Sequence, residues 1–134
     1  MIRSIAQGIE QREFVQTGTF VLKQGMVGSN AYMIESGKIE ISVKDPDGDD
    51  VHLAELGPGE LVGEMAAMFG GRRCATACAL EDCVLIAIPG RDLQETVRKS
   101  SGLYDFVMNM VTERARDMQT KILKKQQEKL AGGR

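Results

Sequence analysis

Residues 61–79, with the sequence LVGEMAAMFGGRRCATACA, constrain this chain more than any other stretch. Gly63 leads into a carboxylate, Glu64, and the run EMAAMF that begins there is compatible with one or two helical turns. The first N–H groups of such a helix have no partner within it and attract an anion. Two glycines and two arginines follow, and a guanidinium is a planar, permanently charged fork suited to phosphate. One segment therefore offers donors for a phosphate and, in Glu64, an acceptor for sugar hydroxyls.

The order and spacing of these residues resemble a known motif. G-E-x-A followed by R-x-A-T, with nine positions from Glu64 to Arg73, resembles the phosphate-binding cassette of cyclic nucleotide-binding domains. That family includes domains of the catabolite activator protein and of the regulatory subunit of cAMP-dependent protein kinase. Upstream, FVQTGTFVLKQGMVGSNAYMIESGKIEI is similar to the early strands of the family, with glycines at Gly18, Gly25, Gly28 and Gly37. The resemblance covers most of the chain.

The resemblance implies a role for each residue of the cassette. Arg73 would bind the ring phosphate, and Glu64 would accept a hydrogen bond from the ribose 2′-hydroxyl. Backbone donors would come from Gly63, Ala66 and Cys74. The other residues expected to bind the ligand are Val62, Met65, Ala75 and Thr76 in the cassette and Arg114 on the C-terminal helix, as a lid contact to the base.

Two positions depart from the pattern of the family. Arg72 stands where the family often has proline, and we interpret it as a solvated side chain that adds long-range attraction for an anion. Cys74 stands where the family usually has alanine, serine or threonine. A hydroxyl there can help to select guanine, by resemblance, whereas a thiol is a weak donor. The resemblance thus favours cAMP over cGMP as the ligand and leaves the choice of base open.

Short runs of β-forming residues, separated by turns, dominate residues 14–89. Ile39, Ile41 and Val43 alternate with polar residues, which predicts a strand with one buried face. Residues 45–48, Asp-Pro-Asp-Gly, form a turn signal, since proline presets one backbone angle and glycine accepts a positive one. Many short strands at this spacing predict an antiparallel sandwich or barrel. The resemblance makes this a jelly-roll β-barrel, or double-stranded β-helix, in a mainly β fold with C-terminal α.

Helical signals follow Pro89. Residues 90–99 predict a short helix, 100–102 a break or cap, and 103 to about 130 a long helix with apolar residues at steps of three and four. Residues 1–13 also have the spacing of a short helix. A chain of 134 residues suits one domain. We expect a single domain over 1–134, made of an N-terminal helix (1–13), a β-roll (14–89) with the cassette at 61–76, and C-terminal helices (90–134).

Charge and composition narrow the function. A net charge of -2, with no basic stripe in the first hundred residues, disfavours nucleic acid as a direct partner. No apolar run approaches the roughly 20 residues that cross a bilayer, and the N-terminus lacks the apolar core of a signal peptide, so we expect a cytoplasmic protein without membrane contact. The single histidine, His52, and three cysteines without a zinc spacing predict no metal site. No nucleophile–base pair is visible, so we predict no catalysis and no cofactor beyond the nucleotide ligand.

The apolar stripe of the long helix continues through Ala115, Met118 and Ile122, further than a small barrel can cover. Pairing of this helix between two copies in a homodimer is therefore one hypothesis, with Lys125 and Lys129 ending the seam. Nucleotide binding would move this helix and pass the signal to an unknown effector or to another subunit. Two alternatives to this regulatory module stay open: an interaction or scaffold protein with a degenerate pocket, and a metal-dependent, cupin-like enzyme.

Overall fold

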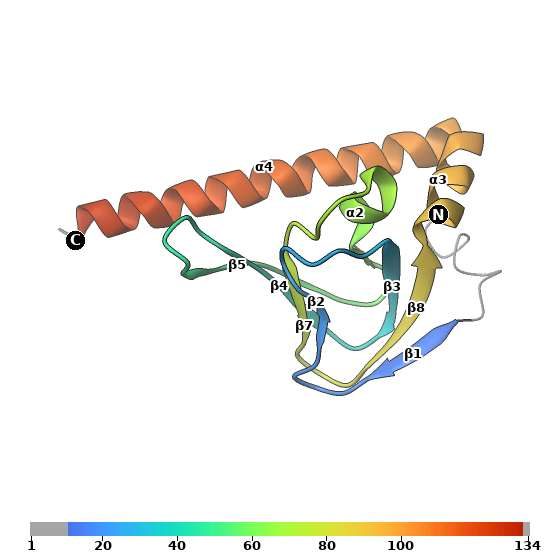
Figure 1. Ribbon diagram of the computed structural model, residues 1–134, viewed down its shortest axis with the longest axis horizontal. Coiled ribbons are helices and arrows are strands. Elements are labelled where there is room, and N and C mark those ends of the chain that lie inside the picture. The colour runs from blue at the N-terminus through green and yellow to red at the C-terminus, as the bar shows by residue number, and fades with distance from the viewer. Residues whose placement is uncertain (1–10, 133–134) are drawn as a thin grey trace.

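Residues 11–132 are described in the computed structural model of the chain. Eight strands and three helices are assigned within these residues. Their bounds are β1 Arg12–Val15, β2 Phe20–Leu22, β3 Asn30–Ser36, β4 Ile39–Lys44, β5 Asp50–Leu56, β6 Leu61–Val62, α2 Glu64–Phe69, β7 Thr76–Ala79, β8 Cys83–Pro89, α3 Gly90–Lys99 and α4 Ser101–Ala131. The strands lie along one side of α4, which extends over the whole length of the molecule (Figure 1).

The strands form two four-stranded antiparallel sheets, in the orders β1-β8-β3-β6 and β2-β7-β4-β5. Eight strands in two Greek-key sheets are the arrangement of a jelly roll. The expected fold class, mainly β with C-terminal α, is confirmed. The expected barrel is not closed, because the end strands of one sheet, β1 and β6, do not pair with the end strands β2 and β5 of the other. The roll is therefore an open sandwich.

Three apolar clusters are buried within residues 11–132, and two of them hold the sheets and the helices α3 and α4 together. One lies between the sheets and includes Ile34, Ile39 and Leu85, each fully buried. The other lies outside the first sheet, where α3 and α4 cover it with Leu93 and Val107 among others. Strand β8 contributes to both cores, so that its sequence CVLIAIP is apolar almost throughout instead of alternating.

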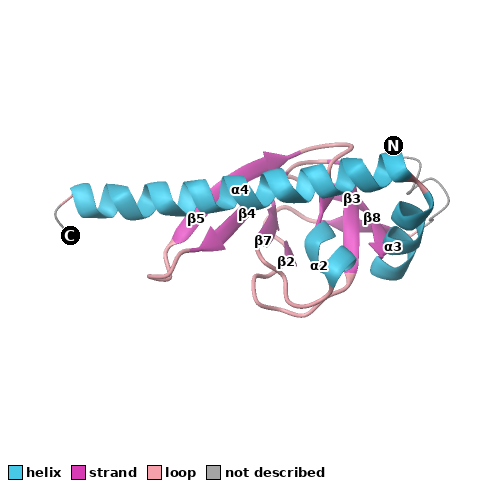
Figure 2. Ribbon diagram, turned by 90° about the horizontal axis from the view of Figure 1, so that it is seen from above, coloured by secondary structure: helices cyan, strands magenta, loops and turns pink. Residues whose placement is uncertain are grey.

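The long helix α4 begins at Ser101, two residues before the expected start at 103. Ser100 supplies the reason: its hydroxyl accepts a hydrogen bond from the Leu103 N–H at 3.3 Å, and this cap lets the helix begin at the next residue. The helix has 31 residues and a length of roughly 46 Å at 1.5 Å per residue. Seen from above, it lies across β4 and β5 (Figure 2). None of the helices within residues 11–132 is both long and apolar enough to span a membrane.

The second half of α4 is covered by its own chain. Met118 and Ile122 pack against Val43, Val51 and Leu53 of the β4–β5 hairpin. This hairpin extends beneath the helix (Figure 1), further than a compact barrel would. The observation that suggested a helix pairing between two copies is thus explained within one chain, and the homodimer stays a prediction without that support.

The expected N-terminal helix over residues 1–13 falls mostly outside the described residues. Where it overlaps them, it is wrong: Arg12 and Glu13 belong to strand β1, whose backbone pairs with β8. Pairing with the sheet overrides the helical spacing of this segment, because Arg12 to Val15 pair along their whole length with residues 83–86 of β8.

Candidate functional site

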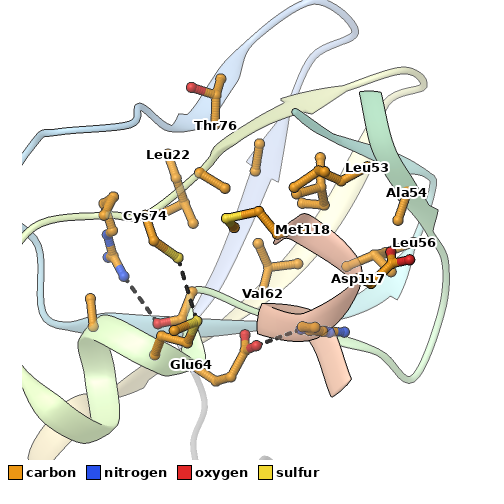
Figure 3. A pocket seen from close by; sticks show the side chains of 18 residues that line it. Leu22, Leu53, Ala54, Leu56, Val62, Glu64, Cys74, Thr76, Asp117 and Met118 are labelled. Carbon is orange, nitrogen blue, oxygen red and sulfur yellow. Dashed lines mark hydrogen bonds and ion pairs between the residues drawn. The ribbon is translucent and has the colours of Figure 1, made fainter. Parts of the chain in front are cut away.

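A cavity of about 90 Å³ lies between the cassette, the second sheet and α4 (Figure 3). All the residues expected to bind a ligand line this one cavity: Val62, Gly63, Glu64, Met65, Ala66, Arg73, Cys74, Ala75, Thr76 and Arg114. The cassette supplies one wall through the end of β6, the start of α2 and the loop into β7. Helix α4 closes the opposite side with Arg114, Asp117 and Met118. Residues far apart in the sequence therefore meet around one small space.

Arg73 is held in place by the loop between β2 and β3. Its N–H donates to the Met26 carbonyl and its carbonyl accepts from the Gly25 N–H, each at 2.8 Å. Its guanidinium lies against Gly28 and Gly63. A Cβ at Gly28 would come within 2.7 Å of a guanidinium nitrogen, and one at Gly63 within 2.8 Å of Nη1. Both positions therefore need glycine to leave room for the arginine.

The electrostatic setting of Arg73 is unusual. The residue is only 7% exposed, and its Nη1 donates to the Gly63 carbonyl at 3.2 Å. No carboxylate within residues 11–132 forms an ion pair with it. Burial lowers the pKa of Arg73, because water no longer solvates the charge. A guanidinium stays protonated and offers five N–H donors. This buried cation can therefore bind an anion from outside the chain.

Glu64, the first residue of α2, carries the opposite charge into the same cavity. It is 4% exposed, and its Oε1 lies 2.8 Å from Nη1 of Arg114. The same Nη1 also donates to the Leu61 carbonyl at 2.6 Å. Arg114 thus occupies one carboxylate oxygen of Glu64 and ties α4 to the cassette.

Gly63 makes the turn into α2 possible. Its φ of 80° lies in the left-handed region, which residues with a Cβ rarely adopt. The Gly63 carbonyl accepts from the Ala67 N–H at 3.2 Å and so starts the helix. The N–H groups of the first turn precede that bond and lack an acceptor within the helix. They add to the positive potential that Arg73 creates.

Cys74 and Thr76 both line the cavity, and each side chain also makes a hydrogen bond within the chain. The Cys74 thiol donates to the Met65 sulfur at 3.5 Å, and burial, followed by the nearby Glu64 charge, raises the pKa of Cys74. The thiol is therefore protonated at neutral pH. The Thr76 hydroxyl accepts from the Gln24 N–H at 3.0 Å and lies at the margin of the cavity, pointing away from its centre (Figure 3). Thr76 thus fixes the loop after β2.

Several lining residues were not expected from the sequence: Leu22, Ile41, Leu53, Ala54, Leu56, Ala77, Asp117 and Met118. The last two had a usable signal, since they follow Arg114 by three and four positions and so share its helix face. Figure 3 shows Met118 projecting from α4 toward Cys74 and Val62. The other six come from four strands of the second sheet, β2, β4, β5 and β7. Apolar residues in a strand indicate a buried face and do not show what that face contacts.

The cavity contains no cluster of metal-ligating side chains among the residues that the structure describes. One group of three carboxylates elsewhere has its oxygens within 4.8 Å of one another, namely Asp45, Asp47 and Asp49 at the β4–β5 turn. None of these three lines the cavity. The cavity itself therefore combines one buried cation, one buried carboxylate and an apolar wall, which suits an anion that also carries hydroxyls and an apolar ring.

Comparisons with known proteins agree with this chemistry. The family model of the cyclic nucleotide-binding domain matches residues 12–100. The cyclic AMP receptor protein of Thermus thermophilus is 37% identical over 89 residues, which are 66% of this chain and 41% of that protein. The cAMP-dependent protein kinase regulatory subunit of Yarrowia lipolytica is 35% identical over 83 residues, 62% of this chain and 20% of that protein.

The fold is similar as well. The crystal structure of the Thermus thermophilus catabolite activator protein matches with a TM-score of 0.76 and 29% identity, and the match covers 90% of this chain and 56% of that one. The matched part of the chain corresponds to less than half the length of the cyclic AMP receptor protein and of the protein kinase regulatory subunit.

Proposed function

The chain belongs to the family of cyclic nucleotide-binding domains, and from that membership we propose that it is a regulatory module whose cavity binds a cyclic nucleotide, cAMP in preference to cGMP. The observation that carries the proposal is Arg73, a buried guanidinium without a carboxylate partner within residues 11–132. A ring phosphate supplies the missing negative charge and several acceptor oxygens.

The cavity wall suggests how the rest of the ligand is bound. The ribose 2′-hydroxyl donates to Glu64, which faces the same cavity as Arg73. The base then lies toward the apolar side of the cavity, where Leu53 of β5 forms part of the wall. The Cys74 thiol is a weaker donor than a hydroxyl, and this supports the preference for adenine over guanine.

Ligand entry requires α4 to move. A cavity of about 150 Å³ holds a molecule the size of benzene, and the cavity here is about 90 Å³. A cyclic nucleotide, with a base, a sugar and a phosphate, needs more space than that. Because Met118 and Arg114 of α4 close the cavity, α4 has to be displaced and the Glu64–Arg114 pair has to exchange for the ligand. Binding is thereby coupled to the position of the helix, which is how the signal leaves the domain.

We assign the chain a binding role and no catalytic one. The output is read by a partner that the helix contacts, either an effector protein or a second copy of the chain, and neither nucleic acid nor a membrane is a direct partner in this proposal. The cavity lacks a nucleophile–base pair among the described side chains, so the nucleotide is a signal and not a substrate.

Calorimetric titration with cAMP and cGMP tests the proposal. We expect the parent to bind cAMP more tightly than cGMP, and Arg73→Ala to weaken cAMP binding by about tenfold or more, since a hydrogen bond to a charged group contributes about 1.5–3 kcal/mol. Arg72→Ala is the matched control, because the Arg72 guanidinium is exposed and donates to the Gly25 carbonyl at 2.8 Å. Arg73→Lys keeps the charge and removes the fork. Absence of heat with both nucleotides would instead favour an interaction protein with a degenerate pocket.

A further inference from the structure

The distal end of α4 is fastened to the turn between β4 and β5. The Lys129 ammonium lies 2.7 Å from a carboxylate oxygen of Asp45, 2.9 Å from one of Asp47 and 2.6 Å from one of Asp49. The Asp45 side chain is fully buried, whereas those of Asp47 and Asp49 are more than half exposed. Gln126, one turn earlier, donates to Asp45 at 3.1 Å. We call Lys129 and the three aspartates the latch.

The turn presents its carboxylates in a fixed arrangement. One oxygen of Asp45 accepts from the N–H groups of Asp47 and Asp49, each at 2.9 Å, and Gly48 adopts a φ of 85° that closes the turn. Three like charges this close repel one another. The Lys129 ammonium offsets that repulsion, and its hydrogen bond is the main reason why the pKa of Asp45 is lowered to about 2. The turn and the helix end therefore stabilise each other.

The same helix closes the nucleotide cavity. Between the cavity and the latch, Lys121 donates to the Leu53 carbonyl and Lys125 donates to the Asp50 carbonyl at 2.6 Å. Three lysines at steps of four residues thus tie α4 along β5, which ends the second sheet. Leu53 itself lines the cavity. Any displacement of α4 that makes room for a nucleotide has to pull against these contacts, and the latch is the most strongly charged of them.

We propose that Lys129 sets the nucleotide affinity from outside the cavity, as a positioning residue, by stabilising the conformation in which α4 closes the site. The inference rests on the proposed function. If only a fraction of the molecules has α4 displaced, the apparent dissociation constant is the intrinsic one divided by that fraction. Weakening the latch increases the fraction and so tightens binding. By linkage, nucleotide binding loosens the latch to the same extent.

The test compares two lysine variants of the full chain by calorimetry with cAMP. Lys129→Gln removes the latch cation. Lys124→Gln removes the same charge from an exposed lysine on the same helix, whose side chain has no hydrogen bond or ion pair within residues 11–132. We expect Lys129→Gln to bind cAMP about threefold to tenfold more tightly than the parent, and Lys124→Gln to bind as the parent does.

Thermal unfolding separates this role from a merely structural one. Lys129→Gln should unfold at a lower temperature than the parent in the absence of nucleotide while binding cAMP more tightly; a structural contact alone would lower stability without raising affinity. A double variant, Asp47→Asn with Asp49→Asn, attacks the latch from the other side. It keeps the backbone hydrogen bonds of Asp45, so the turn is retained, and it should also tighten binding.

The outcomes are distinct. Equal or weaker cAMP affinity in both latch variants, with a parent that binds cAMP, overturns the role of Lys129 and leaves the proposed function standing. A parent that binds neither cAMP nor cGMP overturns the proposed function and this inference with it. Amide hydrogen exchange measures the reverse effect, that of cAMP on the latch. Saturating cAMP should speed the exchange of residues 121–131 in the parent. Unchanged exchange would contradict the coupling.

Discussion

Arg73 and Lys129 are both cations that lie against the β-roll, and their surroundings are opposite. Arg73 is buried beside a carbonyl with no carboxylate partner in the described chain, whereas Lys129 is surrounded by three carboxylates at 2.6–2.9 Å. A buried charge without a partner is costly, so its retention indicates a binding role. The Lys129 ammonium is paired with three carboxylates of the same chain, so its role is to hold α4 against the β4–β5 turn. The comparison teaches that the surroundings of a charge, and not its type, tell a binding site from a structural contact.

The largest expected effect is on cAMP affinity, and it follows from removing the Arg73 guanidinium. Arg73→Met replaces a buried cation by an apolar side chain of similar length, which is often neutral or stabilising. We therefore expect cAMP affinity to fall at least about tenfold while the unfolding temperature stays the same or rises. Differential scanning calorimetry with and without cAMP measures both. A large loss of stability in Arg73→Met would mean that the arginine is structural, and the comparison with Lys129 would fail.

The glycine that makes room for Arg73 gives the next effect. Gly28→Ala places a Cβ about 2.7 Å from the guanidinium, which has to shift. We expect cAMP affinity to fall roughly fivefold to tenfold, since a misplaced donor loses most of a charged hydrogen bond. Gly57→Ala is the matched control, because nothing lies within 4 Å of its added Cβ. Equal affinities for the two variants would show that the position of the guanidinium does not matter.

Glu64 is expected to contribute less, because Arg114 competes for it. In the parent, 2′-deoxy-cAMP should bind several-fold more weakly than cAMP, since one hydrogen bond to a carboxylate is lost. In Glu64→Ala that difference should nearly disappear. Calorimetry with both ligands on both proteins forms a double-mutant cycle. Equal discrimination in the two proteins would place the ribose elsewhere.

The smallest effect is the pH dependence of the latch. The pKa of Asp45 is lowered from 3.8 to about 2, and that of Lys129 is raised above its ordinary value of 10.5. The carboxylate contribution is therefore present above pH 3.8 and is lost as the pH falls through about 2. The ammonium contribution is present below pH 10.5.

Thermal unfolding of the parent and Lys129→Gln at several pH values measures this contribution. The gap in unfolding temperature, a few degrees at pH 7, should shrink between pH 4 and pH 2. A gap that stays constant over this range would show that Lys129 stabilises the chain by packing and not by charge.

The cassette illustrates what the sequence can predict. Short-range spacing placed Glu64, Arg73 and their neighbours, because these residues lie within one turn–helix–loop unit whose geometry depends on local glycines. The same holds for the strands and for the short helix 90–99, whose periodicity is local. Arg114 was predicted from its place on the long C-terminal helix, and in the structure it lines the same cavity.

The latch shows what the sequence could not predict. Asp45 and Lys129 are 84 residues apart, and their contact depends on how far the β4–β5 hairpin extends beneath α4. The sequence marked residues 45–48 only as a turn and read Lys125 and Lys129 as the end of a seam between two copies. Apolar spacing shows that a helix face is buried and does not show what covers it. In this chain the cover is the chain's own hairpin.

A crystal structure of the chain with cAMP tests the central claim most directly. The account predicts the ring phosphate within hydrogen-bonding distance of the Arg73 guanidinium, the ribose hydroxyl on Glu64 in place of Arg114, and α4 displaced from the cavity with Lys129 away from the three aspartates. A nucleotide bound away from Arg73, or one bound beside it with α4 and Lys129 unmoved, would contradict the account.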